Sequence, residues 1–591
     1  RVILISLDGA AAADLEHYYR QGEFDELRGF RRFFEEGQVA EGLIPVDPTL
    51  TSPNHASLAT GAPPARTGIV GNTFHRPGDP VGKTVSGFDL PLETEALWET
   101  ARRQGKRAVS ITWPHAHGPG SGGGRRADRG VLYVNDPEAD ARLVELARSD
   151  WGEPDRAYWR ATDSPLRMAR VAIEGRDGAR VAVKLYAADG RDDGAVRYDT
   201  IEVWPEVEDV RPDVLEPGGL WAQVELDPHP RGEDQGPAVS YAKLLELAPD
   251  LARARIYFGG AFRTRAFPPP YLEAVRGGGL SWPGAPDDDL LEAFWAGKPG
   301  IDLPTWLEQA QNLADFYGQL LVGLPGSDDW DLALVYLPHI DEAGHQLYLA
   351  SPRQPGWSRE RMVEFENARR AVWRMADRVL AQLFATGEAM ADTAVVVVSD
   401  HGMHPLHSML DPNFLLRREG LQQADAEGRV VAAGTSAWAA TSSAMAHVYL
   451  TAPAEERAPL TERLRRLFAD FEVEGERPVA RVVTRKEAGA MGLDHPAAGD
   501  LLLFAAPGWL MDRAGARRGA ATGPADHLGA HGYLSSEPRM RAIYLALGPG
   551  VERGRIGPVR TTEVAGRVAA LLGIGPPHPL PSMPQPPAEP P

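Results

Sequence analysis

The sequence contains no cysteine among its 591 residues. Disulfide bonds and thiolate metal sites are therefore excluded, and any metal ion would be held by oxygen and nitrogen ligands. No stretch approaches the run of about 18 apolar residues that spans a membrane. Basic residues are also few, with 62 Lys and Arg against 82 Asp and Glu, and the net charge of −20 argues against bulk binding of nucleic acid, which needs a basic face.

The length of the chain exceeds that of one ordinary hydrophobic core, so we expect a large α/β domain with insertions. Part of the chain is rich in Gly, Pro and Asp and carries short alternating runs such as ARVAVKLYAA, which are typical of β-hairpins. The predicted parts are a first core segment at 1–118, an inserted β-rich domain and candidate lid at 119–300, core at 301–412, a small α/β lobe at 413–525, core at 526–575 and a Pro-rich tail at 576–591.

Three apolar, β-branched runs each end at an acidic residue. RVILISLDG leads to Asp8, DLALVYLPHIDEAGH to Asp341 and His345, and TAVVVVSDHGM to Asp400 and His401. Such runs, separated by helical stretches, predict strands of a parallel sheet that is buried on both faces. Each acidic residue alone would read as the N-cap of the next helix. Because ligand sites in these sheets lie off the carboxyl ends of the strands, the five side chains are together expected to converge.

A sixth candidate ligand is a histidine near the C-terminus. In DHLGAHGYLSS, His531 precedes a glycine, as His401 does, and that glycine allows close approach of the backbone. His527 lies four residues away, so the residues alone leave both histidines open.

The segment VDPTLTSPNHASLATG is rich in hydroxyl groups and predicts a rigid loop that enters a helix capped by Ser52 or Asn54. A helix N-terminus with free amides is also a place to hold a phosphoryl group. Thr51, placed there beside a dication, would lose its proton near neutral pH and attack phosphorus. Three carboxylates, three imidazoles and this hydroxyl fit two zinc ions about 4 Å apart, which predicts a phosphoric ester hydrolase.

Seven segments resemble, in order, the nucleotide pyrophosphatase/phosphodiesterase branch of the alkaline phosphatase superfamily. They are LISLDG, TLTSPNHASLATG, TGIVGN, ALWETARRQGKRAVSITWPH, IDEAGH, DHGM and HGYLSSEPRMRAIYLALGPG. Apart from the insertion they span nearly the whole chain. The resemblance implies an alkaline-phosphatase-like three-layer sandwich with a mostly parallel central sheet.

The resemblance also implies roles for single residues. Thr51 matches the nucleophilic threonine, and Asn54 matches an asparagine whose amide helps to hold a nonbridging phosphoryl oxygen. The ligands of the zinc beside the nucleophile are matched by Asp8, Asp400, His401 and Thr51 itself. The ligands of the zinc that activates water are matched by Asp341, His345 and His531. The implied reaction is two in-line displacements through a phosphothreonine intermediate, and the resemblance favours His531 over His527.

Charge favours phosphodiesters and phosphoanhydrides as substrates, because Asn54 rather than an arginine lies next to the nucleophile and a monoester dianion calls for a cationic pocket. Ser52 stands where an aromatic residue is common in the family. The alternatives are a phosphomonoesterase of the alkaline phosphatase type, a phosphonate hydrolase, a phosphoryl transferase, or a metal-binding module without turnover. Manganese is the alternative to zinc.

We expect a small phosphoester, including nucleotides, as the partner of the site. Because Arg1 begins directly in an apolar strand, a removed signal peptide and export to the periplasm or the outside of the cell are expected.

Overall fold

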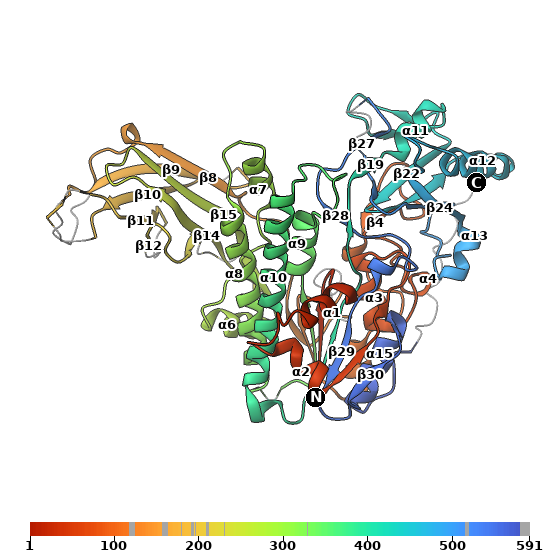
Figure 1. Ribbon diagram of the computed structural model, residues 1–591, viewed down its shortest axis with the longest axis horizontal. Coiled ribbons are helices and arrows are strands. Elements are labelled where there is room, and N and C mark those ends of the chain that lie inside the picture. Colours follow the sequence, from red (N-terminus) through yellow and green to blue (C-terminus); the bar gives the residue numbers. More distant parts are fainter. Residues whose placement is uncertain are drawn as a thin grey trace. The chain divides into compact units, whose positions relative to one another are not determined.

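The computed structural model describes residues 1–578 except 118–124, 156–163, 179, 191–193, 196, 208–211, 228, 230, 328 and 514–518. The Gly-rich start of the predicted insertion and most of the predicted Pro-rich tail lie outside the described residues. Two units are present, one made of Arg1–Asp128 with Leu321–Pro591 and the other of Arg129–Leu320 (Figure 1). Within the described residues, no helix is long and apolar enough to cross a membrane.

The apolar runs of the sequence form the middle of a mixed sheet in the first unit. Its strands, in spatial order, are β6 (Ala108–Ile111), β16 (Leu332–Leu337), β1 (Val2–Leu7), β17 (Ala394–Val398), β29 (Tyr544–Leu547), β2 (Gln38–Ala40) and β30 (Gly554–Ile556). The first four are parallel, whereas β29 runs antiparallel to both of its neighbours. All residues of β1, β16 and β17 are buried, as their continuous apolar sequence requires.

Helices cover both faces of this sheet. On one side of β29 lie α2 (Gly29–Glu36) and α10 (Arg359–Ala385), and on the other lie α3 (Thr51–Thr60) and α15 (Thr561–Leu572) (Figure 1). α10 packs against α2 and against α9 (His339–Leu347), while α15 packs against α3 and β1. The remaining helices of this layer system are α1 (Ala12–Arg20), α4 (Pro64–Thr67) and α5 (Leu97–Arg103). The predicted α/β class with a mostly parallel central sheet is therefore confirmed.

A smaller group of elements in the first unit has its own antiparallel sheet. The strands are β22 (Ala437–Ser442), β23 (Met445–Leu450), β25 (Leu501–Ala505) and β24 (Val479–Thr484), and the helices are α11 (Pro412–Arg418), α12 (Ala454–Ala469) and α13 (Arg485–Ala488). Leu464 and Phe468 of α12 share a core with Leu501 and Leu503 of β25. Two short ladders tie loops together, namely β18 (His404–Pro405) with β28 (Gly529–Ala530), and β19 (Ser408–Leu410) with β26 (Trp509–Met511) and β27 (Thr522–Pro524).

The second unit is built from antiparallel strands. One sheet holds β9 (Arg167–Glu174), β10 (Arg180–Ala188), β11 (Thr200–Pro205) and β12 (Asp213–Leu215), and the other holds β13 (Ala222–Asp227), β14 (Gln235–Leu247) and β15 (Arg253–Phe267), with β7 (Arg129–Val131) and β8 (Arg142–Ala147) paired to β15. One apolar core contains residues of both sheets, for example Val183 and Ile256. The helices are α6 (Pro269–Gly277), α7 (Asp288–Trp295) and α8 (Leu303–Gly323).

The end of the second unit differs from the predicted end of the insertion at residue 300. Glu308 of α8 forms an ion pair with Lys243 of β14 and accepts a hydrogen bond from the Trp221 indole at 2.8 Å. These polar contacts attach α8 to the strands, and its amphipathic sequence alone does not reveal that attachment.

The α2 helix obtains its N-terminal cap from α10 rather than from its own sequence. Arg28, at the N-cap position, has a φ of 65° and makes no side-chain capping hydrogen bond. Instead the amide of Phe30 donates to Asp377 Oδ1 at 2.6 Å. Burial raises the pKa of the Asp377 carboxyl to about 7. A side chain on Gly29 would collide with the Asp377 carbonyl oxygen, so this glycine is needed for the close approach.

Asp377→Asn should make thermal stability less dependent on pH. The wild-type carboxyl has a folded-state pKa of about 7, above its unfolded value, so its contribution to stability is full at low pH and is lost as pH rises through 7. Asn keeps an acceptor for Phe30 and does not titrate. Thermal unfolding followed by circular dichroism from pH 5 to 7.5 should show the variant gaining about 2–4 °C relative to wild type. A constant difference between the two proteins would contradict the assignment.

Candidate active site

The strand ends place the predicted ligands next to one another. Asp8 follows β1, Asp341 and His345 lie on α9 directly after β16, and Asp400 follows β17. His401 comes next in the chain, Thr51 opens α3, and His531 follows β28. Ligand atoms of Asp341, His345 and His531 lie within 4.8 Å of one another, and so do those of Asp8, Asp341 and His401. Asp341 therefore belongs to both groups.

The close approach of β1 and α9 depends on a glycine. Gly9 has a φ of +69°, and a Cβ atom at this position would come within 2.8 Å of Asp341 Oδ1. Its amide also donates to Asp400 Oδ1 at 3.3 Å. Gly9, which follows Asp8, thus permits close contact with Asp341 and helps to orient Asp400.

Each of the three histidines is oriented by a hydrogen bond from its Nδ1 to a backbone carbonyl. His345 donates to Gly529 at 2.8 Å, His401 to Gly402 at 3.0 Å, and His531 to Thr49 at 3.1 Å. Their Nε2 atoms are consequently left to bind a proton or a metal ion. The His401 Nε2 lies 3.1 Å from Asp400 Oδ2 and 3.4 Å from Asp8 Oδ1. Such backbone contacts are typical of imidazoles that bind metals through Nε2.

Hydrogen bonds also orient two of the carboxylates. The Tyr336 hydroxyl donates to Asp8 Oδ2 at 2.6 Å, and the His401 amide donates to Asp400 Oδ1 at 3.0 Å. The second oxygens, Asp8 Oδ1 and Asp400 Oδ2, are buried without a hydrogen-bond partner, as is Asp341 Oδ1. Buried carboxylate oxygens without partners are costly unless a cation satisfies them. The donor set therefore fits hard or borderline divalent metal ions.

The pKa values reflect this crowding of buried charge. Burial, together with the charges of Asp400 and Asp341, raises the pKa of Asp8, and burial raises that of Asp400 to about 7. Burial lowers the pKa of His531 to about 4. His345 behaves differently because, although burial opposes it, the charge of Asp341 raises its pKa to about 9. Without a cation the cluster therefore holds protons on some of its ligands at neutral pH.

Thr51 lies in this cluster. Its Oγ1 is 3.3 Å from His401 Nε2, and the residue is 6% exposed. As the first residue of α3, it has a backbone amide among those that lack a partner within the helix. The hydroxyl and the backbone amide of Thr51 thus lie together at the start of α3, which suits the binding and attack of a phosphoryl group.

Asn54 has an environment that differs from the expected one. Its Nδ2 contacts the carbonyl oxygens of Pro48 and Leu50, both at 3.0 Å, and its Oδ1 accepts from the Val46 amide at 2.8 Å. The side chain is fully buried. It therefore holds the loop before α3 through backbone contacts, and its amide is taken up by them.

Asn72 is a residue that the sequence interpretation did not single out. Its Oδ1 accepts a hydrogen bond from the Ser52 amide at 2.8 Å, which places its side-chain amide beside the first turn of α3. The segment TGIVGN was noted as a family motif, but no local spacing linked its asparagine to Thr51. The link arises because the chain after α3 folds back on the start of that helix.

His527, the rival of His531, lies at the edge of the cluster. Its ring centre is 5.4 Å from that of His345, and its Nδ1 bonds the adjacent Asp526 at 2.6 Å. His531 instead stacks on His401 with ring centres 3.7 Å apart. The geometry thus groups His531 with the other ligands.

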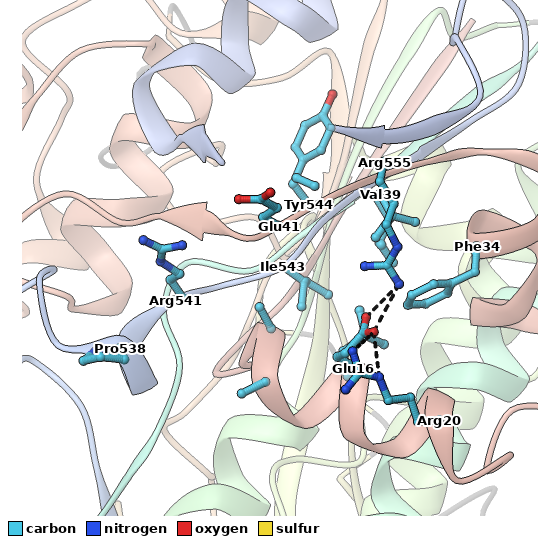
Figure 2. Close-up of a pocket in the computed structure, with 15 residues that line it drawn as sticks. Glu16, Arg20, Phe34, Val39, Glu41, Pro538, Arg541, Ile543, Tyr544 and Arg555 are labelled. Carbon is cyan, nitrogen blue, oxygen red and sulfur yellow. Dashed lines mark hydrogen bonds and ion pairs between the residues drawn. The ribbon is translucent and has the colours of Figure 1, made fainter. Parts of the chain in front are cut away.

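A cavity of about 330 Å³ lies between α1, β2 and β29, and Figure 2 shows residues that line it. Arg20 and Arg555 both donate to Glu16 at one side of it, each at 3.0 Å, and Arg541 lines another part. None of the predicted ligands nor Thr51 lines this cavity. It is therefore distinct from the cluster at the strand ends.

An α/β fold that gathers carboxylates, imidazoles and a helix-terminal hydroxyl at its strand ends has the arrangement of a metal-dependent hydrolase. The chain belongs to the type I phosphodiesterase/nucleotide pyrophosphatase family, since residues 2–166 and 252–534 match the model of that family. The family implies divalent metal ions as cofactors.

Two curated relatives match over short stretches. Human ectonucleotide pyrophosphatase/phosphodiesterase family member 1 is 31% identical over 121 residues, which are 19% of this chain and 12% of that protein. Alkaline phosphatase PhoV of Synechococcus elongatus is 50% identical over 50 residues, which are 8% of this chain and 9% of that protein. The chain thus matches a small part of the length of either relative.

Solved structures of ectonucleotide pyrophosphatase/phosphodiesterase 5 align along nearly the whole chain. The murine protein covers 99% of this chain and 97% of its own, with a TM-score of 0.46 and 13% identity. An inactive form of the murine protein in complex with AMP covers 99% and 96%, with a TM-score of 0.46 and 12% identity.

Metal binding to this cluster should release protons. Below a pH of about 7 Asp400 is protonated in the metal-free protein, and His345 carries its proton up to about pH 9, so a metal ion must displace both protons. Calorimetric titration of metal-stripped protein with Zn²⁺ at pH 6 and pH 8, in two buffers of different ionisation enthalpy, should show weaker binding at pH 6 and buffer-dependent heats. Equal affinity at both pH values would contradict this prediction.

Proposed function

We propose that the protein hydrolyses phosphodiesters or phosphoanhydrides, nucleotides among them, with two divalent metal ions and Thr51 as the nucleophile. The observation that carries this proposal is the position of Thr51 Oγ1 at the start of α3, 3.3 Å from His401 Nε2 in a cluster with buried, unpartnered carboxylate oxygens. Zinc suits the mixed oxygen and nitrogen ligands, with manganese as the alternative.

The ligands divide into two sets. Asp8, Asp400 and His401, with Thr51, would hold one ion, and Asp341, His345 and His531 would hold the other. Bound ions supply charge neutralisation and Lewis-acid activation of the attacking and leaving oxygens. The chain itself orients the imidazoles through backbone hydrogen bonds to Nδ1. The Tyr336 hydroxyl and the His401 amide hold one oxygen each of Asp8 and Asp400 and leave the other without a partner.

The reaction then runs in two displacements. Thr51 Oγ1 attacks phosphorus, a phosphothreonine forms, and an alcohol or nucleotide leaves. Water next attacks the phosphothreonine, releases the phosphoryl product and restores the hydroxyl. In both steps the side-chain amide of Asn72 and the backbone amide of Thr51 would donate to the nonbridging oxygens, where negative charge develops.

The charge of these donors favours diesters. A neutral side-chain amide and a backbone amide suit the single negative charge of a diester, whereas a monoester dianion calls for a cationic group. The family assignment points the same way, because its description names phosphodiesterases and nucleotide pyrophosphatases. Export from the cytoplasm, expected from the sequence, stays a prediction.

The test compares bis-p-nitrophenyl phosphate, p-nitrophenyl phosphate and p-nitrophenyl thymidine monophosphate on metal-reconstituted protein. Turnover should favour the two diesters and should stop after chelation, since the metal ions activate the oxygens on both sides of phosphorus. Preference for the thymidine ester would add recognition of a base. Preference for the monoester would instead make the protein a phosphatase, and no turnover would favour a phosphonate hydrolase, a transferase or a binding module.

The same assay tests the nucleophile. Thr51→Ala should abolish turnover while metal content stays near that of wild type, whereas Thr51→Ser keeps a hydroxyl and should retain measurable turnover. Acid quenching of the wild type during turnover, followed by peptide mass spectrometry, should find phosphate on Thr51. Wild-type rates for Thr51→Ala would exclude it as the nucleophile.

The two asparagines near Thr51 should respond differently to substitution. Asn72→Ala should lower kcat by about 10²–10³ with little change in melting temperature, because it removes a donor to the transition state. Asn54→Ala should instead lower stability by about 1–3 kcal/mol, since the buried carbonyls of the loop lose their donor. Steady-state kinetics and thermal unfolding of both variants distinguish the roles. A catalytic loss in Asn54→Ala at wild-type stability would return the role to Asn54.

A further inference from the structure

A buried histidine touches the residue that follows the nucleophile. His115 lies in the loop after β6 and is 5% exposed. Its Nε2 is 3.3 Å from Ser52 Oγ and 3.4 Å from Ser52 O, and its Nδ1 is 3.3 Å from the Leu90 carbonyl oxygen. Ser52 itself is fully buried, so no solvent competes for its hydroxyl.

The ring of His115 is bonded to Ser52 in either of its neutral tautomers. Burial lowers its pKa to about 4, so the ring is neutral near pH 7 and carries one N–H. A carbonyl oxygen can only accept, so this N–H serves either the Leu90 carbonyl through Nδ1 or the Ser52 carbonyl through Nε2. In the first tautomer Nε2 accepts from the Ser52 hydroxyl, and in the second it donates to Ser52. One serine and one histidine are thus joined by neutral hydrogen bonds.

The backbone of His115 indicates that this contact is maintained against strain. Its φ is 67°, in the left-handed region that residues with a Cβ rarely adopt. Such strain persists where the surroundings over-determine a conformation, and it is often found at functional sites. Here the conformation directs the ring between the Leu90 carbonyl and the first turn of α3.

The chain of hydrogen bonds continues to Asn72. The Ser52 amide donates to Asn72 Oδ1 at 2.8 Å, and the Gly87 amide donates to the Asn72 carbonyl at 2.8 Å. A side chain on Gly87 would come within 3.0 Å of Ser52 Oγ, so the backbone closes tightly over the serine. Fixing Ser52 therefore fixes both the first turn of α3 and the orientation of the Asn72 amide.

We propose that the His115–Ser52 pair is a positioning device that holds Asn72 and the first turn of α3 in register with the phosphoryl group. This inference rests on the proposed function, because it acts through Thr51 and Asn72. In the proposed reaction neither His115 nor Ser52 touches the reacting atoms. Their effect is alignment, which matters more in the transition state than in the bound substrate.

A double-mutant cycle tests the pair. Ser52→Ala removes the hydroxyl, and His115→Asn tolerates the left-handed backbone and can still donate to Leu90 but is too short to reach Ser52. Each variant should lower kcat about 10- to 100-fold with KM, metal content and melting temperature near wild type. The double variant should lose no more than either single variant, because both break the same link. Additive losses, or wild-type kcat in either single variant, would overturn the proposal.

Ser57→Ala is the matched control. Ser57 lies on the same helix, is fully buried, and its Oγ has no hydrogen-bond partner. Loss of this hydroxyl should leave kcat unchanged. If Ser57→Ala lowers kcat as much as Ser52→Ala, the effect reflects general sensitivity of α3 and the proposal fails.

Crystal structures separate this inference from the proposed function, since they need no turnover. Relative to wild type, Ser52→Ala should show the Asn72 side chain displaced or in more than one rotamer, with the zinc ligands unmoved. An unchanged, singly ordered Asn72 would overturn the positioning role even in an active enzyme. If the wild type is inactive but Asn72 is displaced in Ser52→Ala, the proposed reaction is refuted, while the structural link between Ser52 and Asn72 is confirmed.

Discussion

The structure depends on three carboxylates that lie buried together at the ends of three neighbouring parallel strands. Asp8, Asp341 and Asp400 each keep one oxygen without a hydrogen-bond partner, and burial raises the pKa of the first and the third. Like charges so close in an apolar interior are unfavourable unless cations lie between them. The metal-free protein therefore already carries the unfavourable free energy of these crowded carboxylates. A bound metal ion relieves it, and that relief contributes to metal affinity.

The backbone around the cluster brings these side chains together and orients them. Gly9 lets the first strand approach Asp341, and backbone carbonyls hold the Nδ1 atoms of His345 and His401, that of Gly529 from another loop and that of the adjacent Gly402. Because these contacts come from the backbone, they vary little with side-chain identity and leave the Nε2 atoms available. The parallel sheet supplies the convergence, while the loops supply the orientation.

The sequence permitted prediction of the α/β class and of the convergence at the strand ends, since each ligand carries its local context with it. A buried apolar run followed by an acidic residue predicts both a strand and the direction of its end. Asn72 and His115 have no such signature. They reach Ser52 from loops 20 and 63 residues away, so their roles depend on tertiary folding. The attachment of α8 to the second unit through Lys243 and Glu308 could not be predicted from the sequence for the same reason.

The proposed nucleophile Thr51 and the candidate metal ligands are thus held by two different kinds of force. The carboxylates and imidazoles interact through charge, which is strong in a buried site and changes whenever a metal or proton binds. The first turn of α3 is held by neutral hydrogen bonds from His115, Asn72 and the loop that Asn54 braces, and these do not change with the charge state of the cluster. Separating the two would allow the charges to change during the proposed reaction while the Thr51 hydroxyl keeps its position. A helix start positioned by ion pairs would shift with every change in charge of the cluster, whereas this one is anchored to uncharged groups.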